Sequence, residues 1–312
     1  MVLIGKSRRS QTLFLGSVIA ILVFSTSARP SGQAPENGFA FFVAADVREY
    51  AGAKYRGPGY FLSACETMKR LGGEFLVSPG DIDPPQPVRD VITQVFGAQF
   101  PWYPGVGNHD FGKADLAWIR RYNQGGASLP SIVRMGPPGA EETMYAFDHE
   151  NAHFVVINEY FNGKSDHASG GDISDAVFFW LNEDLAANLK PFVFVFGHEP
   201  AYPLPDMDTG KERHEETSLN RNAKHRDRMW KLLAQYKATA FICGHTHTAS
   251  AKKIDGVWQL DTGHARGKGD SSIPSTFLRI VVMNEEARFE IYRSNGKGVD
   301  YRLRLSGLLT KD

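Results

Sequence analysis

Residue types that bind metal ions follow directly after five short apolar segments of this chain, and this feature constrains the fold most strongly. Continuous apolar runs of this length are typical of strands buried on both faces. The carboxyl ends of adjacent parallel strands meet at one edge of a sheet, so the side chains after them converge on one crevice. The five polar stretches are Asp46, Gly80-Asp81, Gly107-Asn108-His109-Asp110, Gly197-His198 and Gly244-His245-Thr246-His247.

The order of the expected elements indicates an α/β protein. We expect helices over residues 59–71, 175–189 and 224–236, and strands over 39–47, 75–78, 102–106, 144–148, 153–158, 192–196 and 239–243. Residues 251–305 alternate like an antiparallel meander. Strand–helix alternation followed by antiparallel strands favours sheets that pack together with helices outside. We predict one domain over residues 39–312.

The balance of charge argues against some partners. The 312 residues include 35 basic and 35 acidic side chains, so the formal net charge is zero. Nucleic-acid polymers and anionic membranes select a basic excess or stripe. We therefore expect no nucleic-acid polymer and no stable membrane partner.

The first 28 residues have the three-part layout of a secretory signal. Lys6, Arg8 and Arg9 are followed by 13 mostly apolar residues, 12–24, and by the small residues 25–28. We predict a signal peptide over 1–28, a linker over 29–38 and export to the periplasm or the extracellular space. An uncleaved anchor is the alternative, although the apolar run is short for a membrane span. Arg8-Arg9 is compatible with the twin-arginine route, but Gln11 and Thr12 fit that pattern poorly.

The polar stretches carry the right donors for divalent ions. Carboxylate, amide oxygen and imidazole suit manganese, iron or zinc. A carboxylate such as Asp81 can bridge two ions about 3.5–4 Å apart, and such a pair supplies hydroxide and clamps an in-line phosphoryl displacement. The preceding glycines let the backbone turn sharply and approach an ion or a phosphate.

In this order, the stretches resemble the calcineurin-like metallophosphoesterase superfamily. Its motifs are Asp-x-His, Gly-Asp, Gly-Asn-His-Asp/Glu, a lone His and Gly-His-x-His, and the match runs from Asp46 to His247. The helix with Trp180-Leu181 before the lone-His strand is a further common feature. The resemblance implies a four-layer α/β/β/α sandwich of two mixed sheets flanked by helices. The branch, purple acid phosphatase or cyclic-nucleotide phosphodiesterase-like, stays open.

The resemblance also implies ligands for two divalent metal ions. One ion would take Asp46, Asp81 and His247, and the other would share Asp81 and take Asn108, His198 and His245. His109 would donate to the substrate phosphate and protonate the leaving oxygen, a suitable role for an imidazole near a cationic centre. Asn108 would also face the substrate.

The first motif departs from the family because it reads Asp46-Val47-Arg48. Arginine stays protonated and cannot ligate a cation, so the first site loses a ligand. Three outcomes are then open. The first site binds its ion weakly, a water molecule or a neighbouring residue takes the place of the missing ligand, or the protein holds only one ion. We expect Arg48 to bind phosphate oxygens of the substrate; the alternative is that it points to solvent or pairs with a surface acid.

A second departure concerns the acid that orients His109. Many members have Asp where this chain has Pro84, and purple acid phosphatases have a ligating tyrosine at about the same place, so Pro84 argues against an iron–tyrosinate site. Asp83 and Asp110 are both candidates for the orienting acid.

We therefore predict an exported, metal-dependent hydrolase of a small phosphomonoester or phosphodiester. The alternative is a degenerate member that binds a phosphorylated ligand or partner without turnover, which Arg48 favours.

Several other residues allow simpler expectations. Cys65 and Cys243 are expected as free buried thiols rather than a bridge. His149 and His153 are expected at the surface beside a hairpin turn. Residues 201–226 are expected to form either a substrate-selecting lid or a solvated loop. His264 is expected near the rim of the crevice, but not as a metal ligand.

Overall fold

The computed structural model describes residues 37–48, 60–167, 170–266, 272–295 and 300–309. By backbone proximity the chain divides into Met1–Ser31 and Gly32–Asp312, and all described residues belong to the second unit. The predicted signal peptide, and the predicted linker up to residue 36, lie outside the described residues.

Two sheets form the centre of the second unit. The first has six strands in the order β13-β12-β11-β1-β2-β3, of which β1, β2 and β3 are mutually parallel. Its strands are β1 (Gly38–Val43), β2 (Leu76–Ser78), β3 (Trp102–Pro104), β11 (Thr276–Met283), β12 (Ala287–Ser294) and β13 (Tyr301–Leu308).

The second sheet has seven strands in the order β4-β5-β6-β7-β8-β10-β9, with β6, β7, β8 and β10 parallel to one another. Its strands are β4 (Ile132–Met135), β5 (Tyr145–His149), β6 (Ala152–Val156), β7 (Phe192–Phe196), β8 (Ala240–Cys243), β9 (Ala249–Ile254) and β10 (Val257–Thr262). Both sheets are mixed, as the sequence predicts.

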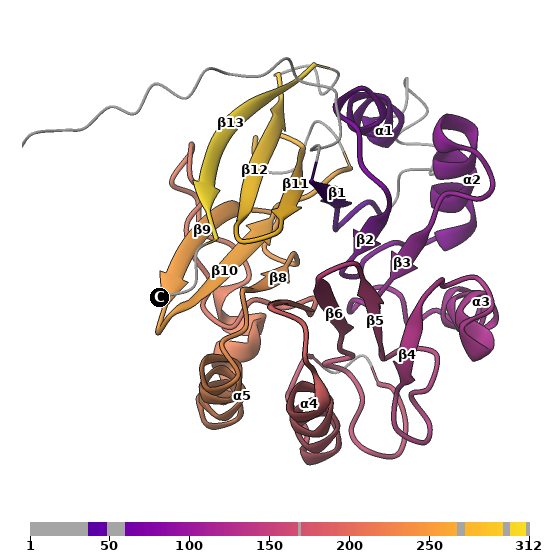
Figure 1. Cartoon of the computed structure of the whole chain (residues 1–312), viewed down its shortest axis with the longest axis vertical. Coiled ribbons are helices and arrows are strands. Elements are labelled where there is room, and N and C mark those ends of the chain that lie inside the picture. The colour runs from indigo at the N-terminus through magenta and orange to yellow at the C-terminus, as the bar shows by residue number, and fades with distance from the viewer. Residues whose placement is uncertain (1–36, 49–59, 168–169, 267–271, 296–299, 310–312) are drawn as a thin grey trace, which may run out of the picture. The chain divides into compact units, whose positions relative to one another are not determined.

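Helices cover the outer face of each sheet (Figure 1). The helices α1 (Tyr60–Leu71), α2 (Pro85–Phe96) and α3 (Lys113–Asn123) pack on the first sheet, and α4 (Asp175–Ala187) and α5 (Ala223–Gln235) pack on the second. The predicted four-layer α/β/β/α sandwich is confirmed.

Alternation along β1 shows how the sequence builds these layers. Phe41 packs between the sheets, with ring centroids 5.1 Å from both Phe75 and Phe154. Phe42 points to the other face and joins the cluster under α1 and α2. Since successive side chains of a strand face opposite sides, a strand covered on both sides must be apolar throughout. This need explains the continuous apolar runs in the sequence.

Some predicted elements differ from the observed ones. The expectations did not include α2, α3 or β4, whose sequences are more polar than those of the buried strands. The predicted C-terminal meander is divided: β9 and β10 belong to the second sheet, and only β11, β12 and β13 form an antiparallel meander in the first. Apolar alternation identifies strands, but it carries no information on which sheet each one joins.

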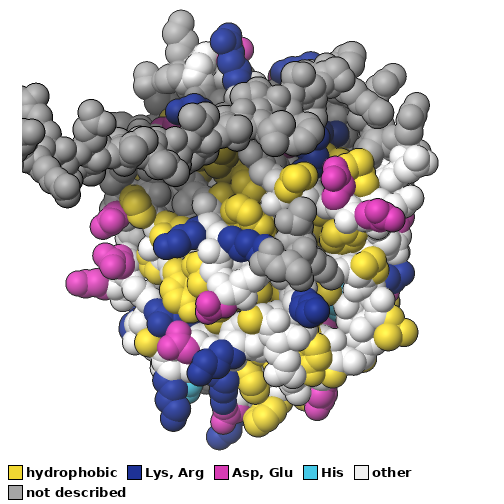
Figure 2. Space-filling model, turned by 60° about the vertical axis from the view of Figure 1, so that its left-hand side comes forward, with side chains coloured by type: hydrophobic (Ala, Val, Ile, Leu, Met, Phe, Trp, Pro, Cys, Tyr) yellow, Lys and Arg dark blue, Asp and Glu magenta, His cyan; other side chains and the backbone are white. Residues whose placement is uncertain are grey.

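Cys65 and Cys243 are free and buried, which confirms the expectation of two thiols. Among the described residues, none of the helices has the length and apolar character that a membrane crossing requires. Figure 2 brings the side of β9, β12 and β13 forward, and there Lys, Arg, Asp and Glu side chains are interspersed with hydrophobic patches.

Candidate metal centre

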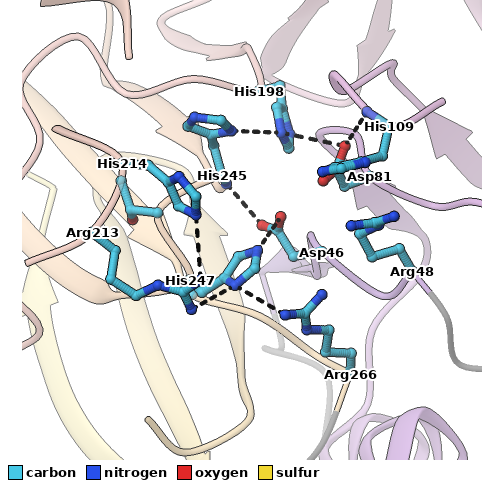
Figure 3. Close-up of polar contacts among 12 residues, drawn as sticks. Asp46, Arg48, Asp81, His109, His198, Arg213, His214, His245, His247 and Arg266 are labelled. Carbon is cyan, nitrogen blue, oxygen red and sulfur yellow. Dashed lines mark hydrogen bonds and ion pairs between the residues drawn. The ribbon is translucent and has the colours of Figure 1, made fainter. Parts of the chain in front are cut away.

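The predicted ligands come together where parallel strands of both sheets end. Asp46, Asp81 and Asn108 follow β1, β2 and β3 of the first sheet. His198 follows β7, and His245 and His247 follow β8, in the second sheet. The two sets meet across the edges of the two packed sheets (Figure 3).

Left-handed backbone conformations aim several of these side chains inward. Asp46, Asp81, His245 and His247 have φ angles of 52°, 53°, 68° and 59°. Such conformations are uncommon for residues other than glycine and cluster at functional sites. Each of these residues turns the chain back just beyond its strand.

Two glycines allow the backbones to approach the ligands closely. A Cβ atom on Gly107 would lie 2.3 Å from Asp81 Oδ1, and one on Gly244 would lie 2.4 Å from Asp46 Oδ2. Any side chain at either position would therefore collide with a candidate ligand. The glycine–ligand spacing seen in the sequence reflects this packing.

One half of the centre is built on Asp46. His247 Nε2 lies 3.2 Å from Asp46 Oδ1, and the backbone N–H of His245 donates to Asp46 Oδ2 across 2.8 Å. Within the described chain, Oδ1 of Asp46 is buried and accepts no hydrogen bond. A buried carboxylate oxygen in this state fits a cation as its missing partner.

The other half brings two imidazoles and one amide together. Asn108 Oδ1 lies 3.1 Å from His198 Nε2 and 3.1 Å from His245 Nδ1, and the two ring nitrogens lie 3.3 Å apart. His198 Nε2 also lies 3.5 Å from Asp81 Oδ1. This close set of nitrogen and oxygen donors suits a transition metal ion.

Asp81 lies between the two halves. Ligand atoms of Asp46, Asp81 and His198 lie within 4.8 Å of one another, and all three residues are buried. The residues therefore fit the metal that the family implies, with Asp81 placed to be shared.

The electrostatics keep these groups in the protonation states that bind metals. Although burial alone raises the pKa of Asp46, His247, His198 and His245 outweigh it and hold the pKa below the usual range. Burial and the neighbouring His198 lower the pKa of His245 to about 2. Asp46 is thus an anion and His245 neutral, which metal ligation requires.

Asp110 fixes the two loops of the first sheet. Its buried carboxylate accepts hydrogen bonds from the backbone N–H groups of Asp81 (2.8 Å), Ile82 (2.9 Å) and Gly107 (2.7 Å). Burial, and secondly Asp81, raise the pKa of Asp110 well above its usual value. Asp110 therefore holds the loop backbones in place.

Arg48 pairs with the second candidate acid, Asp83. Arg48 Nε donates to Asp83 Oδ1 across 3.1 Å. His109 is exposed beside them, and its backbone N–H donates to Asp81 Oδ1 across 2.9 Å. His109 also acts electrostatically on Asp83. The roles predicted for His109 and Arg48 stay predictions.

Residues 201–226 lie against the centre. Arg213 Nη1 lies 2.9 Å from His247 Nδ1, and Thr217 Oγ1 lies 3.3 Å from His245 Nε2. The ring of His214 lies 5.0 Å from that of His245. The segment thus contacts the candidate centre, whereas its role as a substrate-selecting lid stays a prediction, and the sequence expectations did not include the contacts of Arg213 and Thr217.

Arg266 is a second residue that the sequence expectations did not include. Its Nη2 lies 3.4 Å from His247 Nδ1. Its position shortly after β10 was a usable signal, because the other site residues also follow strand ends. His264 is buried, with its ring 5.7 Å from that of His247.

Comparisons with known proteins agree with this geometry. Residues 41–249 match the family model of the calcineurin-like phosphoesterases. Tartrate-resistant acid phosphatase type 5 from Oryctolagus cuniculus is 24% identical over 275 residues, covering 81% of this chain and 76% of its own. The enzyme of the same name from Mus musculus is 24% identical over 271 residues, covering 77% of this chain and 75% of its own.

Two solved structures share the fold. GAP50, described as the anchor in the inner membrane complex of Plasmodium, superposes with a TM-score of 0.61 at 14% identity, covering 89% of this chain and 90% of its own. PhoD superposes with a TM-score of 0.60 at 12% identity, covering 91% of this chain and 72% of its own. The chain belongs to the calcineurin-like phosphoesterase family and is a metal-dependent phosphoric ester hydrolase.

Proposed function

We propose that the protein hydrolyses a small phosphomonoester or phosphodiester at a centre of two divalent ions. The observation that carries this proposal is the convergence of six donor residues from five loops, with the buried Asp81 between the two halves that the other five form. Asp46, Asp81 and His247 would hold one ion, and Asp81, Asn108, His198 and His245 the other. Bound ions of this kind activate water and neutralise developing charge on a phosphoryl group.

The residues of the chain then have separate tasks. The buried carboxylates and imidazoles hold the ions, while the more exposed His109 faces the solvent side, where substrate arrives. An imidazole there can donate to a phosphate oxygen and pass a proton to the leaving oxygen. The first half has fewer ligands than the family pattern, because Arg48 replaces a histidine, and we expect weaker metal binding there.

The alternative is a member that binds a phosphorylated ligand without turnover. Its support is the Arg48–Asp83 pair, which stands where the family has a further ligand. The donor residues retained on all five loops favour catalysis over binding alone, because a binding module does not need so many converging donors.

Hydrolysis of p-nitrophenyl phosphate and bis(p-nitrophenyl) phosphate, with added Mn²⁺ or with a chelator, tests the two functions. Turnover of either compound that the chelator abolishes and Mn²⁺ restores supports the enzyme, and the ratio of the two rates separates monoester from diester. Full turnover after removal of every ion, or none with Mn²⁺ added, would contradict it. Asp81→Asn is the matched control, since it removes the shared carboxylate.

We also infer that the protein is exported. The support is the basic, apolar and small-residue order of residues 1–28. The mass of the mature protein and its cell fraction test this inference: an intact N-terminus in the cytoplasm would contradict export.

A further inference from the structure

A buried acid outside the donor set contacts the loop that carries two of the candidate ligands. Thr246 separates the two histidines that follow β8, and its Oγ1 contacts Oδ2 of Asp261, near the end of β10. Thr246 Oγ1 also lies 2.7 Å from Oγ1 of Thr248, which in turn lies 3.1 Å from the carbonyl oxygen of Leu204. We call these four residues the Asp261 network. It joins the ligand loop, β10 and the start of residues 201–226.

The protons of the Asp261 network can be counted. Its three oxygen–oxygen contacts need one proton each, whereas the hydroxyl groups of Thr246 and Thr248 carry one each and the carbonyl group of Leu204 only accepts. Thr248 therefore donates to Leu204, and Thr246 donates to Thr248. The proton between Thr246 and Asp261 must then come from Asp261. All three contacts are hydrogen bonds only when this carboxyl group is protonated.

The remaining contacts agree with a protonated Asp261. Its other oxygen, Oδ1, accepts from the backbone N–H of Gly263 across 3.0 Å, as the carbonyl oxygen of a neutral acid can. Thr246 Oγ1 also accepts from the backbone N–H of Thr248 across 3.2 Å. Thr246 then accepts two hydrogen bonds and donates one, which is the full capacity of a hydroxyl group.

The surroundings of Asp261 favour the neutral form. Asp261 has no exposed surface, and burial raises its pKa well above the usual value, although hydrogen bonds from Thr246 and Gly263 oppose this effect. The titratable groups that act on it are Asp46, which raises its pKa further, His247, which lowers it, and the buried thiol of the neighbouring strand β8. A buried carboxyl group kept neutral can serve as a hydrogen-bond donor.

The ligand loop needs such an anchor because its backbone is strained. His245 and His247, on either side of Thr246, have φ angles of 68° and 59°. Left-handed conformations of residues other than glycine cost free energy and persist only where the surrounding structure holds them. The side chain of Thr246 is fully buried between these two residues, so its hydrogen bond to Asp261 holds both.

We propose that Asp261 is a positioning residue, a neutral acid that donates to Thr246 and so keeps His245 and His247 in the geometry that binds the ions. This inference rests on the proposed function, in which the two histidines belong to different ions. One anchor therefore sets the geometry of both halves of the centre. Asp261 itself contacts neither substrate nor metal in this account.

Asp261→Asn distinguishes a neutral acid from an anion. Its amide can donate to Thr246 and accept from Gly263, as the neutral acid does. An ionised Asp261 would accept at both oxygens, so the NH₂ group of the variant would face one of the two donors. Loss of the hydrogen bonds altogether, in Asp261→Leu, should displace the ligands whatever the charge.

Calorimetric titration of the full chain with Mn²⁺ measures these effects. We expect Asp261→Leu and Thr246→Val to weaken Mn²⁺ binding about 10–100-fold, and Asp261→Asn to stay within about threefold of the parent. Thr67→Val is the matched control, because Thr67 of α1 is also buried and donates to Ser63 O across 2.9 Å. Parental affinity in Asp261→Leu, or a loss in Asp261→Asn as large as in Asp261→Leu, overturns the proposal. Denaturant unfolding checks that each variant folds.

Infrared spectroscopy of the Mn²⁺-loaded protein at neutral pH gives a readout independent of affinity and of turnover. The difference spectrum between the parent and Asp261→Asn should show the C=O band of a protonated carboxyl group only in the parent. Other protonated acids are present in both proteins and cancel. Loss of carboxylate bands instead would show an anion and overturn the proposal. A parent with the carboxyl band and the expected Mn²⁺ affinities that hydrolyses neither p-nitrophenyl compound would refute the proposed function alone.

Discussion

Arg48 donates from Nε to Oδ1 of Asp83 across 3.1 Å, beside the candidate metal centre. Both side chains are largely buried, with exposed fractions of 18% and 19%. Burial raises the pKa of Asp83 even though Arg48 opposes this effect. Arg48 thus pairs with an acid, which was the second of the two expectations for it, and its contact with a phosphate oxygen stays a prediction.

The first prediction is that Arg48→His tightens Mn²⁺ binding at the half built on Asp46 and His247. An imidazole there adds a neutral nitrogen ligand, which arginine cannot provide. We expect roughly tenfold tighter binding, by analogy with the 10–100-fold effects of residues that support ligands. Calorimetric titration of the metal-free protein measures it, with Arg48→Gln as the control that removes the charge without adding a ligand.

The same variant separates the two roles of Arg48. If Arg48 binds the substrate, KM for p-nitrophenyl phosphate should rise in both Arg48→His and Arg48→Gln. Tighter metal binding with an unchanged KM would rule out the phosphate contact.

The second prediction concerns Asp110→Asn. An amide offers one acceptor oxygen and turns an NH₂ group toward the remaining donors, so at least one of the three loop N–H groups loses its partner. Leaving a buried donor unsatisfied costs roughly 1–3 kcal/mol, and displacement of Asp81 should weaken metal binding about 10–100-fold. Denaturant unfolding and metal titration test this, and Asp115→Asn on α3 is the control. A variant with parental metal affinity would show that Asp110 does not position the ligands.

The third prediction is that Gly244→Ala prevents proper metal binding. The new Cβ would lie 2.4 Å from Asp46 Oδ2 and 2.6 Å from Ala45 Cβ, so backbone or ligand must shift. Overpacking of this kind costs about 1–3 kcal/mol. In Gly112→Ala the Cβ meets the carboxylate of Asp115, which can rotate away, and only a small effect is expected. Metal content after dialysis, measured for both variants, checks the difference.

The sequence predicted the centre better than its surroundings, for a physical reason. Asp46, Asp81, His198 and His247 follow buried strands, and strand ends bring such residues together whatever the loops do. Arg213 and Arg266 reach the centre from loops whose paths depend on distant contacts, such as the pair between Asp206 and Arg293. Local sequence does not reveal contacts of that kind.

The sheets show the same contrast. The runs around Phe41 and Phe194 had to be strands because both faces are covered. The assignment of β9 and β10 to the second sheet depends on the parallel pairing of β10 with β8, which alternation alone does not encode.

His153 corrects one expectation and gives the last prediction. It was expected at the surface but is only 3% exposed, and it bridges Asp148 Oδ1 (2.7 Å) and Asp184 Oδ2 (2.8 Å). The hairpin position suggested exposure, but α4 covers this side of β6 and supplies Asp184. Burial alone lowers the pKa of His153, but hydrogen bonds to Asp184 and Asp148 outweigh it and raise the pKa above its usual value.

The raised pKa fixes the sign of the pH effect. A histidine that binds its proton more tightly in the folded state contributes its full stabilisation below the unfolded pKa of about 6.5, and this contribution disappears as the pH rises through the folded pKa. We expect His153→Gln to reduce the free energy of unfolding by roughly 3–5 kcal/mol at pH 6, as for a broken buried pair. The deficit should shrink above the folded pKa.

Urea unfolding of parent and variant from pH 5.5 to 9 measures this difference. The control is His149→Gln, because His149 pairs with the exposed Glu74 and such pairs contribute about 0–1 kcal/mol. A deficit for His153→Gln that stays constant or grows with pH would show that the imidazole is neutral between its two carboxylates. One of those carboxylates would then have to hold the shared proton, because two anions cannot both accept from a ring with a single N–H.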